Sequence, residues 1–268
     1  MSKIWKRLVA YLIDLLIITM LSQGLASTTV LNPNINKYQK YNKEYNEKYI
    51  TYANFTIQLQ KYYQDNKLTE EEYNKLIEKY PAYENNLKKY YQENKLTEKN
   101  YKKLIKVVTK NYAKEANDIY YKIEKTSTPE FIIYLVLTFL YFVGFNYITN
   151  GQTLGKKIMK LKIVNINHEQ SKVSIINYII RTIPMYQTLY YIIRLIGIYT
   201  LNKQMYLDIT SKAYYIQTIL EFLIITCMII RIDGRGVHDI LAKTRVAMYN
   251  REGKEITKYK KVEKENIE

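Results

Sequence analysis

Apolar runs with the length of membrane-spanning helices alternate with long polar stretches along this chain. Residues 8–25 hold one charged side chain, Asp14, and residues 131–148 hold none. Residues 214–230 form a third apolar run with Glu221 near its middle. About 18 predominantly apolar residues are enough for a helix to cross a bilayer. Each of these runs is therefore predicted to be a membrane-spanning helix.

A further apolar segment, residues 174–199, contains Arg181, Pro184 and Arg194. Its length suits a kinked span, whereas its charges also allow a re-entrant or interfacial helix. We prefer a span, because four crossings place both chain ends on the same side of the membrane. A short polar loop, residues 202–213, would then lead to the last run. The prediction is an all-α integral membrane protein with about four transmembrane helices.

Residues 32–128 form a long polar region between the first two runs, and this region contains an internal repeat. Residues 62–70 recur as residues 90–98, at an offset of 28 residues. Each copy predicts a turn followed by a helix that Thr69 or Thr97 caps. Thr69 and Glu72 have the spacing of a capping box, but the second copy has Asn100 in place of the glutamate.

Three helices are predicted in this region, and Pro81 should kink or split the second of them. Their predicted bounds are residues 35–65, 69–93 and 97–126. Apolar and tyrosine positions recur at a spacing of three to four, which favours a small antiparallel helical bundle. The alternative is a set of partly disordered, charged helices. Nothing in the region indicates catalysis.

The basic residues predict which side of the membrane each segment occupies. The chain has a net charge of +16, with Lys and Arg before the first run, in the loop 151–173 and in the tail 251–268. The positive-inside rule makes these segments cytoplasmic. The prediction is a multi-pass protein of the cell (plasma) membrane with cytoplasmic termini. Because the basic residues adjoin apolar runs, they favour a lipid bilayer over nucleic acid as partner.

The scarce residue types exclude several kinds of site. The single cysteine, Cys227, cannot form a disulfide within the chain, and two histidines argue against a typical zinc site. We therefore predict no metal site. We also predict no cofactor and no enzymatic activity, because no segment of the sequence carries a motif for either. A cleaved signal peptide is an alternative for the first run, with residues 24–26 as a small-x-small site. Asp14 in its middle and the later spans argue against that alternative.

The two carboxylates inside the apolar runs are the main candidates for function. Asp14 would lie about 9 Å inside the apolar layer. A carboxylate at such depth is costly and often belongs to a proton or cation pathway. Arg181 lies at a similar depth when counted from Ser174, so we expect it to pair with Asp14 and leave Arg7 to meet Asp239. A purely structural role for Asp14 is the alternative.

The loop after the second run contains the motif Gly-Gln-Thr-Leu-Gly-Lys-Lys at residues 151–157. It lacks the spacing of a phosphate-binding loop, so that interpretation is weak. Residues 162–166 and 172–175 are predicted to form a small cytoplasmic hairpin through a turn at residues 167–170.

Three separated segments of the chain together resemble the RDD family of bacterial integral membrane proteins. The resemblance covers residues 4–30 and 129–250, with a charged tail after residue 250, and residues 32–128 look like an insertion. The first segment contains Arg7 and Asp14, and Arg181 follows the second. The remaining residues that carry the resemblance are Gly151, Gln152, Thr153, Gly155 and Lys156 in the loop, and His238 and Asp239 near the end.

The resemblance implies a transporter of ligands not yet identified, with cation/proton exchange as one idea, and it implies no enzyme chemistry. The His238-Asp239 dipeptide is far short of a metal-dependent phosphohydrolase site. The first hypothesis is a transporter that uses Asp14 and Glu221. The alternative is an envelope interaction protein whose spans anchor an extracytoplasmic helical bundle for a protein partner. A lipid-associated regulatory factor is a third hypothesis, and a small domain of four spans is compatible with a homo-oligomer.

Overall fold

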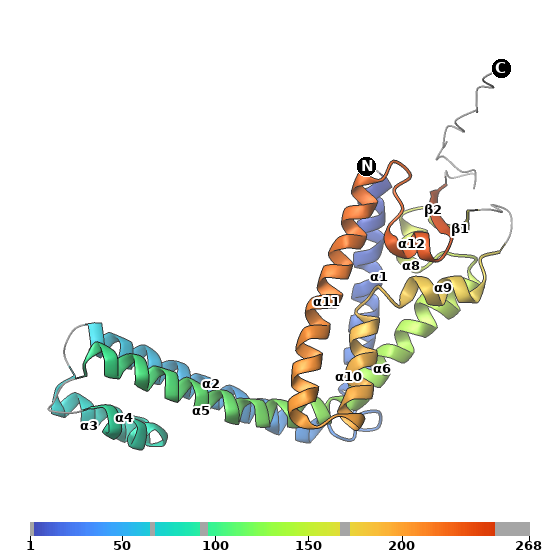
Figure 1. Ribbon diagram of the computed structural model, residues 1–268. Coiled ribbons are helices and arrows are strands. Elements are labelled where there is room, and N and C mark those ends of the chain that lie inside the picture. Colours follow the sequence, from blue (N-terminus) through green and yellow to red (C-terminus); the bar gives the residue numbers. More distant parts are fainter. Residues whose placement is uncertain (1–2, 65–67, 92–95, 167–171, 250–268) are drawn as a thin grey trace. The chain divides into compact units, whose positions relative to one another are not determined.

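The computed structural model describes residues 3–64, 68–91, 96–166 and 172–249 (Figure 1). The chain divides into two compact units. One comprises residues 1–33 and 128–268, and we call it the membrane unit. The other comprises residues 34–127, and we call it the polar unit. The turn predicted at residues 167–170 and the tail at residues 251–268 lie outside the described residues.

Among the residues that the structure describes, three helices, all in the membrane unit, are long and apolar enough to cross a membrane. Helix α1 holds the first apolar run. The second run is one continuous helical segment that includes a π-helical stretch, labelled η2. Helix α11 holds the last run. The bounds are α1 (Lys3–Ala26), α6 (Thr128–Phe139), η2 (Leu140–Phe145), α7 (Asn146–Ile148) and α11 (Lys203–Ile230). All three apolar runs thus form helices, as the sequence predicts.

Residues 174–199 do not form one continuous helix. They form α9 (Ile175–Thr182) and α10 (Thr188–Thr200), separated by a break at residues 183–187. Pro184 cannot donate the hydrogen bond that a continuous helix needs at its position. Tyr186 and Gln187 then adopt left-handed backbone conformations, with φ of 57° and 54°. The segment is therefore sharply broken rather than a single kinked span.

Helix α11 begins much earlier than the sequence predicts, and the loop expected at residues 202–213 is wrong. The side chain of Asn202 caps the helix by accepting a hydrogen bond from the backbone of Met205 at 2.9 Å. The polar first turns stay helical because one face of the helix remains buried. The buried positions recur every three to four residues or at multiples of that spacing: Tyr206, Thr210, Ala213, Gln217, Ile224 and Met228.

A two-stranded antiparallel sheet joins the loop after the second run to the end of the described chain. Strand β1 (Leu161–Asn165) pairs with β2 (Thr244–Met248), so that Leu161 faces Met248 and Asn165 faces Thr244. The hairpin predicted with residues 172–175 is wrong. Ser174 instead caps α9 by accepting a hydrogen bond from the backbone of Asn177, which commits that segment to a helix.

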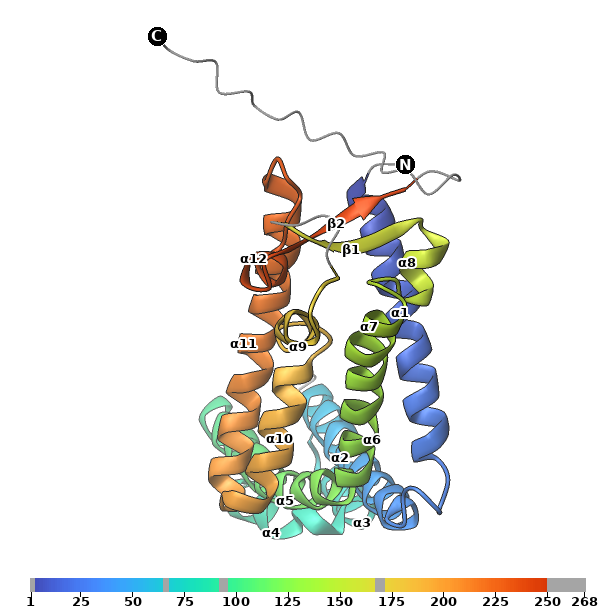
Figure 2. The ribbon, with the colours of Figure 1, turned by 90° about the vertical axis from the view of Figure 1, so that its right-hand side faces the viewer.

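Two short helices, α8 (Leu154–Ile158) and α12 (Val237–Leu241), lie with the sheet at the end of the membrane unit where α1 begins (Figure 2). A buried apolar cluster joins them to the long helices. Its members come from strands, loops and helices alike: Ala10, Val143, Leu161, Ile163, Val173, Tyr178 and Val246. A second cluster lies farther along the helices and contains Ile18, Tyr134, Phe142 and Tyr186. The long helices otherwise expose large apolar side chains, as lipid-facing surfaces do.

The described residues of the polar unit form two long helices, two short ones and one turn of 3-10 helix. These are α2 (Ile35–Gln64), α3 (Glu70–Lys79), η1 (Pro81–Tyr83), α4 (Glu84–Tyr90) and α5 (Glu98–Thr126). Pro81 splits the second predicted helix, which is one of the two outcomes expected from the sequence. The core of the unit comprises Phe55, Leu59, Leu76, Tyr80, Leu87, Leu104 and Val108.

The two copies of the repeat cap their helices in different ways. Thr69 and Glu72 form the predicted capping box at the start of α3. Thr97 also caps its helix, α5, by accepting a hydrogen bond from the backbone of Asn100. The side-chain amide of Asn100 turns away to donate to the carbonyl of Tyr90 at 3.1 Å. Glu72 thus completes the capping box in the first copy. The equivalent residue of the second copy, Asn100, instead links α5 to the end of α4.

Candidate functional site: a charged cavity in the membrane unit

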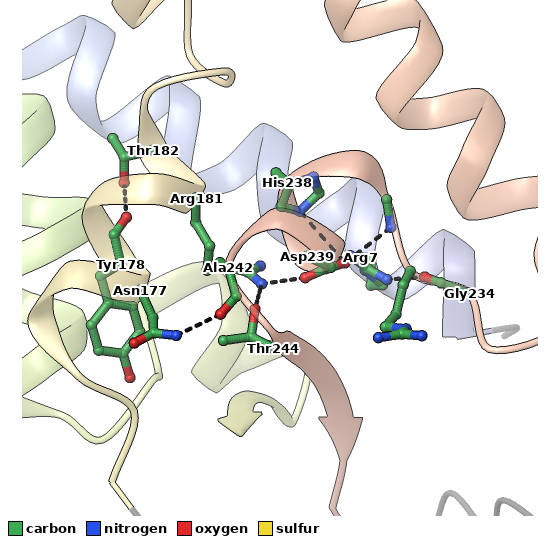
Figure 3. A network of polar contacts seen from close by, with 12 residues as sticks. Arg7, Asn177, Tyr178, Arg181, Thr182, Gly234, His238, Asp239, Ala242 and Thr244 are labelled. Atoms are coloured by element: carbon green, nitrogen blue, oxygen red, sulfur yellow. Dashed lines mark hydrogen bonds and ion pairs between the residues drawn. The ribbon is translucent and has the colours of Figure 1, made fainter. Parts of the chain in front are cut away.

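A buried carboxylate, Asp239, holds two arginines from different helices (Figure 3). Asp239 lies on α12 and has no solvent exposure. Its Oδ2 accepts a hydrogen bond from Arg7 Nη2 at 2.5 Å and another from the backbone of Gly236 at 3.1 Å. Its Oδ1 accepts from Arg181 Nη1. The predicted contact between Arg7 and Asp239 is therefore present.

The two arginines also bind other parts of the same end of the unit. Arg7 Nη1 donates to the carbonyl of Gly234, and Arg181 Nη1 donates to the hydroxyl of Thr244 at 2.5 Å. Asn177 adds a hydrogen bond from its amide to the carbonyl of Ala242 at 2.6 Å. These contacts fix α1, α9 and α12 to one another and to the start of β2. A single carboxylate thus organises segments far apart in the sequence.

The expected pair between Asp14 and Arg181 is wrong, because Arg181 bonds to Asp239 instead. The depth argument assumed that a membrane span begins at Ser174. The segment that begins there is a helix of only 8 residues, and it lies beside α12. Arg181 is near the end of that short helix, at the level of the strands and loops.

The charge environment sets the ionisation of the groups around Asp239. Burial alone raises the pKa of Asp239, but the guanidinium groups of Arg181 and Arg7 hold it well below its usual range. Burial lowers the pKa of the adjacent His238 to about 3, so this imidazole is neutral at physiological pH. A buried carboxylate needs such partners to remain charged. The cluster therefore carries two positive charges and one negative charge.

Asp14 is held by the loop that contains the Gly-Gln-Thr motif. Its Oδ2 accepts a hydrogen bond from the hydroxyl of Thr153 at 2.5 Å, and its Oδ1 accepts from the backbone of Gly155 at 2.8 Å and the hydroxyl of Tyr141 at 2.7 Å. The ammonium group of Lys156 lies 3.8 Å from Oδ2. The carboxylate thus fastens the N-terminus of α8 to α1.

The glycines of the motif permit this close approach. A Cβ atom at Gly155 would lie 2.3 Å from the carbonyl oxygen of Ala10, where no side chain fits. Gly151 has a φ of 91°, and a Cβ there would lie 2.5 Å from the carbonyl oxygen of Ile163. Gln152 donates from its amide to the carbonyl of Leu161 at 3.1 Å. The motif therefore holds the loop against α1 and β1.

A cavity of about 90 Å³ lies next to these two clusters, and most of the predicted charged residues line it. Its lining also includes apolar side chains of α11, such as Ile224 and Met228. The charged and imidazole side chains that face it come from five helices: Arg7 and Asp14, Lys156, Arg181, Glu221, and His238. Asp239 does not line the cavity but binds two of the cations that do.

Residues 113–243 match the sequence model of the RDD family. The match begins within α5 of the polar unit and covers most of the membrane unit after α1. The match includes the loop motif, Arg181 and Asp239, whereas Arg7 and Asp14 precede it. Nothing among the curated proteins and nothing among the solved structures matches the chain. The family that the three sequence segments indicate is thus found, although two of its charged positions lie in a helix before the matched range.

Within the matched range, Lys156 is a buried cation whose charged form is disfavoured by burial. Burial lowers its pKa to about 8, and the nearby Asp14 carboxylate opposes that effect. Its ammonium group donates to the hydroxyl of Thr153 at 3.0 Å. The proton of this side chain can therefore be released near physiological pH.

Glu221 meets neutral donors that the sequence reasoning did not identify. Its Oε1 accepts hydrogen bonds from the backbone of Gln187 at 3.0 Å and from the side chain of Gln217 at 2.9 Å. Pro184 in an apolar run, and a glutamine one helical turn before Glu221, are the sequence signals that could have indicated this site. Among the described residues, no group of three or more His, Cys, Asp or Glu side chains could hold a metal ion.

Proposed function

We propose that the RDD domain, together with α1, is a membrane transporter that exchanges small cations, including protons, through the charged cavity. The observation that carries this proposal is the cavity itself, which gathers two carboxylates and three basic side chains inside a unit with three apolar helices. Ionisable groups within the membrane layer are costly and characteristically line substrate or ion pathways.

The balance of charge favours exchange over net binding. Arg7, Lys156 and Arg181 contribute three positive charges, and Asp14, Glu221 and Asp239 contribute three negative charges to the cavity and the groups bound to it. One bound proton or one bound metal cation adds one charge to this balance, and every further charge in a buried site carries a large electrostatic cost. Release of one cation as another enters avoids that cost, as in exchange of a metal cation for a proton.

The two predicted carboxylates have unequal roles in this proposal. Asp14 accepts three hydrogen bonds and lies beside Lys156, so it acts mainly as a structural clasp. Glu221 has two hydrogen bonds from neutral groups, both to the same oxygen. We therefore assign the exchanging carboxylate to Glu221.

The proposed topology has four crossings, with the third made by the broken pair α9 and α10. Both termini are then on the cytoplasmic side of the cell membrane, where α8, α12 and the sheet also lie. Single-cysteine labelling on a Cys227→Ser background tests this arrangement. A cysteine at the exposed Lys157 should react only after permeabilisation, and one at the exposed Thr51 should react in intact cells. The reverse pattern would contradict the proposal.

Ion flux in proteoliposomes tests the transport function. The purified wild-type chain should exchange Na⁺, Li⁺ or K⁺ against an imposed proton gradient. Glu221→Gln should lower the flux at least tenfold, because the replaced side chain cannot release a proton. Asp208→Asn is the matched control, since this carboxylate lies on the same helix but is exposed beside Lys212. Equal flux in empty liposomes and in wild-type vesicles would refute transport of these ions.

A second candidate function rests on the polar unit. Residues 34–127 form a compact unit with a core of their own, which suits a surface for an extracytoplasmic protein partner. Replacing residues 36–125 with a short flexible linker separates the two candidates. Retained flux supports transport by the membrane unit, whereas loss of the cellular phenotype with flux intact supports a partner-binding role for the polar unit.

A further inference from the structure

The break between α9 and α10 lies against the carboxylate of Glu221. Two consecutive residues of the break, Tyr186 and Gln187, have left-handed backbones, which side chains other than glycine adopt rarely. The hydroxyl of Tyr134 donates to the carbonyl of Tyr186 at 2.7 Å and helps to hold this conformation. The break is thus a defined structure. It interrupts the regular backbone hydrogen bonding that a continuous helix would have at these positions.

Glu221 lies about 14 Å from the end of α11, counted over nine residues, and so well inside the apolar layer. The N–H group of Gln187, directly before α10, donates to its Oε1. The N-terminus of α10 therefore faces the carboxylate. The second hydrogen bond, from Gln217, ends on the same Oε1.

Buried oxygen atoms without hydrogen-bond partners gather at this break. Gln217 is 2% exposed, and its Nε2 donates to the carbonyl of Pro184 at 3.2 Å as well as to Glu221. The Oε1 atom of the same amide is buried and has no partner among the described residues. Thr188, the first residue of α10, also has a buried hydroxyl without such a partner. An unsatisfied buried oxygen is costly, so each of these atoms is available to accept a hydrogen bond or to bind a cation.

Of the three carboxylates Asp14, Asp239 and Glu221, the first two have a positively charged side chain beside them, whereas Glu221 accepts its hydrogen bonds from neutral groups. Asp14 lies beside Lys156, and Asp239 holds both arginines. The other titratable side chains that share the cavity with Glu221 are the phenols Tyr11 and Tyr186 and the neutral imidazole of His238.

We propose that the carboxylate of Glu221 and the Oε1 atom of Gln217 bind a small monovalent metal cation at the helix break. This assignment rests on the proposed function and names its cation site. Carboxylate, amide and hydroxyl oxygens are the ligands that hard cations take. Unwound stretches of discontinuous membrane helices also provide such sites. The single negative charge of the Glu221 carboxylate matches the charge of one monovalent cation.

Thermal unfolding of the full-length protein in detergent tests the site without any flux measurement. Sodium or lithium chloride should raise the unfolding midpoint in a saturable way, relative to choline chloride at the same ionic strength, because ligand binding stabilises the folded state.

Three variants identify the ligands. Glu221→Gln should abolish the rise, and Gln217→Leu should require at least tenfold more cation for the same rise. Asp208→Asn on the same helix should behave as wild type. The absence of a cation-specific rise in the wild-type protein would overturn the site. Ordered water would then be the partner of the unpaired oxygens.

The outcomes also separate this site from the proposed function. A rise that both Glu221→Gln and Gln217→Leu retain would likewise overturn the site, even if flux occurs. A rise that depends on Glu221 and Gln217 supports the site, even if proteoliposomes show no flux and transport is refuted.

Discussion

The two units of this protein use charged residues in opposite ways. The polar unit places its ion pairs on the surface, as in Glu71 with Lys75 and Glu98 with Lys102, one helical turn apart. The membrane unit buries Asp239 between Arg7 and Arg181, which come from helices far apart in the sequence. Exposed pairs contribute little because water screens them, whereas breaking a buried pair leaves an uncompensated charge. The difference predicts where substitutions matter most.

The largest effect is expected for Asp239→Asn. It removes the carboxylate that compensates two buried guanidinium groups, and such losses cost about 3–5 kcal/mol. Folded yield and unfolding in detergent, monitored by circular dichroism, measure the effect. Glu98→Gln, which breaks an exposed pair in the polar unit, is the control and should leave the midpoint unchanged. Equal behaviour of the two variants would refute the contrast between the units.

A smaller effect on the membrane unit is expected from an added methyl group. Gly155→Ala places a Cβ atom 2.3 Å from the carbonyl of Ala10, so α8 must move away from α1. Overpacking of this kind costs about 1–3 kcal/mol. Gly24→Ala is the matched control, because nothing lies within 4 Å of its added Cβ. A lower unfolding midpoint in the first variant alone would support the clasp around Asp14.

The pH dependence of stability should report the burial of Lys156. Its pKa is about 8 in the folded protein, below the usual value for lysine. Between pH 8 and about 10.4 the unfolded chain therefore binds more protons than the folded protein at this residue, so its contribution to stability rises with pH. Unfolding midpoints across this range measure the rise. Lys156→Met should remove it, and a profile unchanged from wild type would show that Lys156 is not the group responsible.

The smallest of these effects is expected in the polar unit. Thr69→Ala removes the cap of α3, and loss of such a cap costs about 1 kcal/mol. A fragment of residues 34–127 should be soluble and mainly helical by circular dichroism, and urea unfolding measures the loss. Thr51→Ala, at an exposed position within α2, is the control. A fragment without helical structure would show that the polar unit needs the rest of the chain.

Local sequence patterns were enough to predict much of the fold. Uninterrupted apolar runs determined the three long membrane helices, because the bilayer demands a fixed length of apolar helix. The capping box at Thr69 and the split at Pro81 follow from hydrogen bonding within a few residues. The contact between Arg7 and Asp239 was also predicted, since both were expected at the cytoplasmic surface.

The pairing of strands and charges required the tertiary structure. β1 finds its partner about 80 residues later, in β2, because Ser174 begins a helix where the sequence suggested a strand. Arg181 bonds to Asp239 rather than Asp14, because α9 packs beside α12, the helix that carries Asp239. The transport roles of Asp14 and Glu221 stay predictions.

The sequence by itself determined which residues could be costly to bury, namely Asp14, Arg181, Glu221 and Asp239. Only the tertiary structure decided which partners compensate them, because that choice depends on contacts between segments with no fixed spacing along the chain. It tied Asp14 to a loop and Asp239 to two arginines. It left Glu221 facing a cavity beside a helix break.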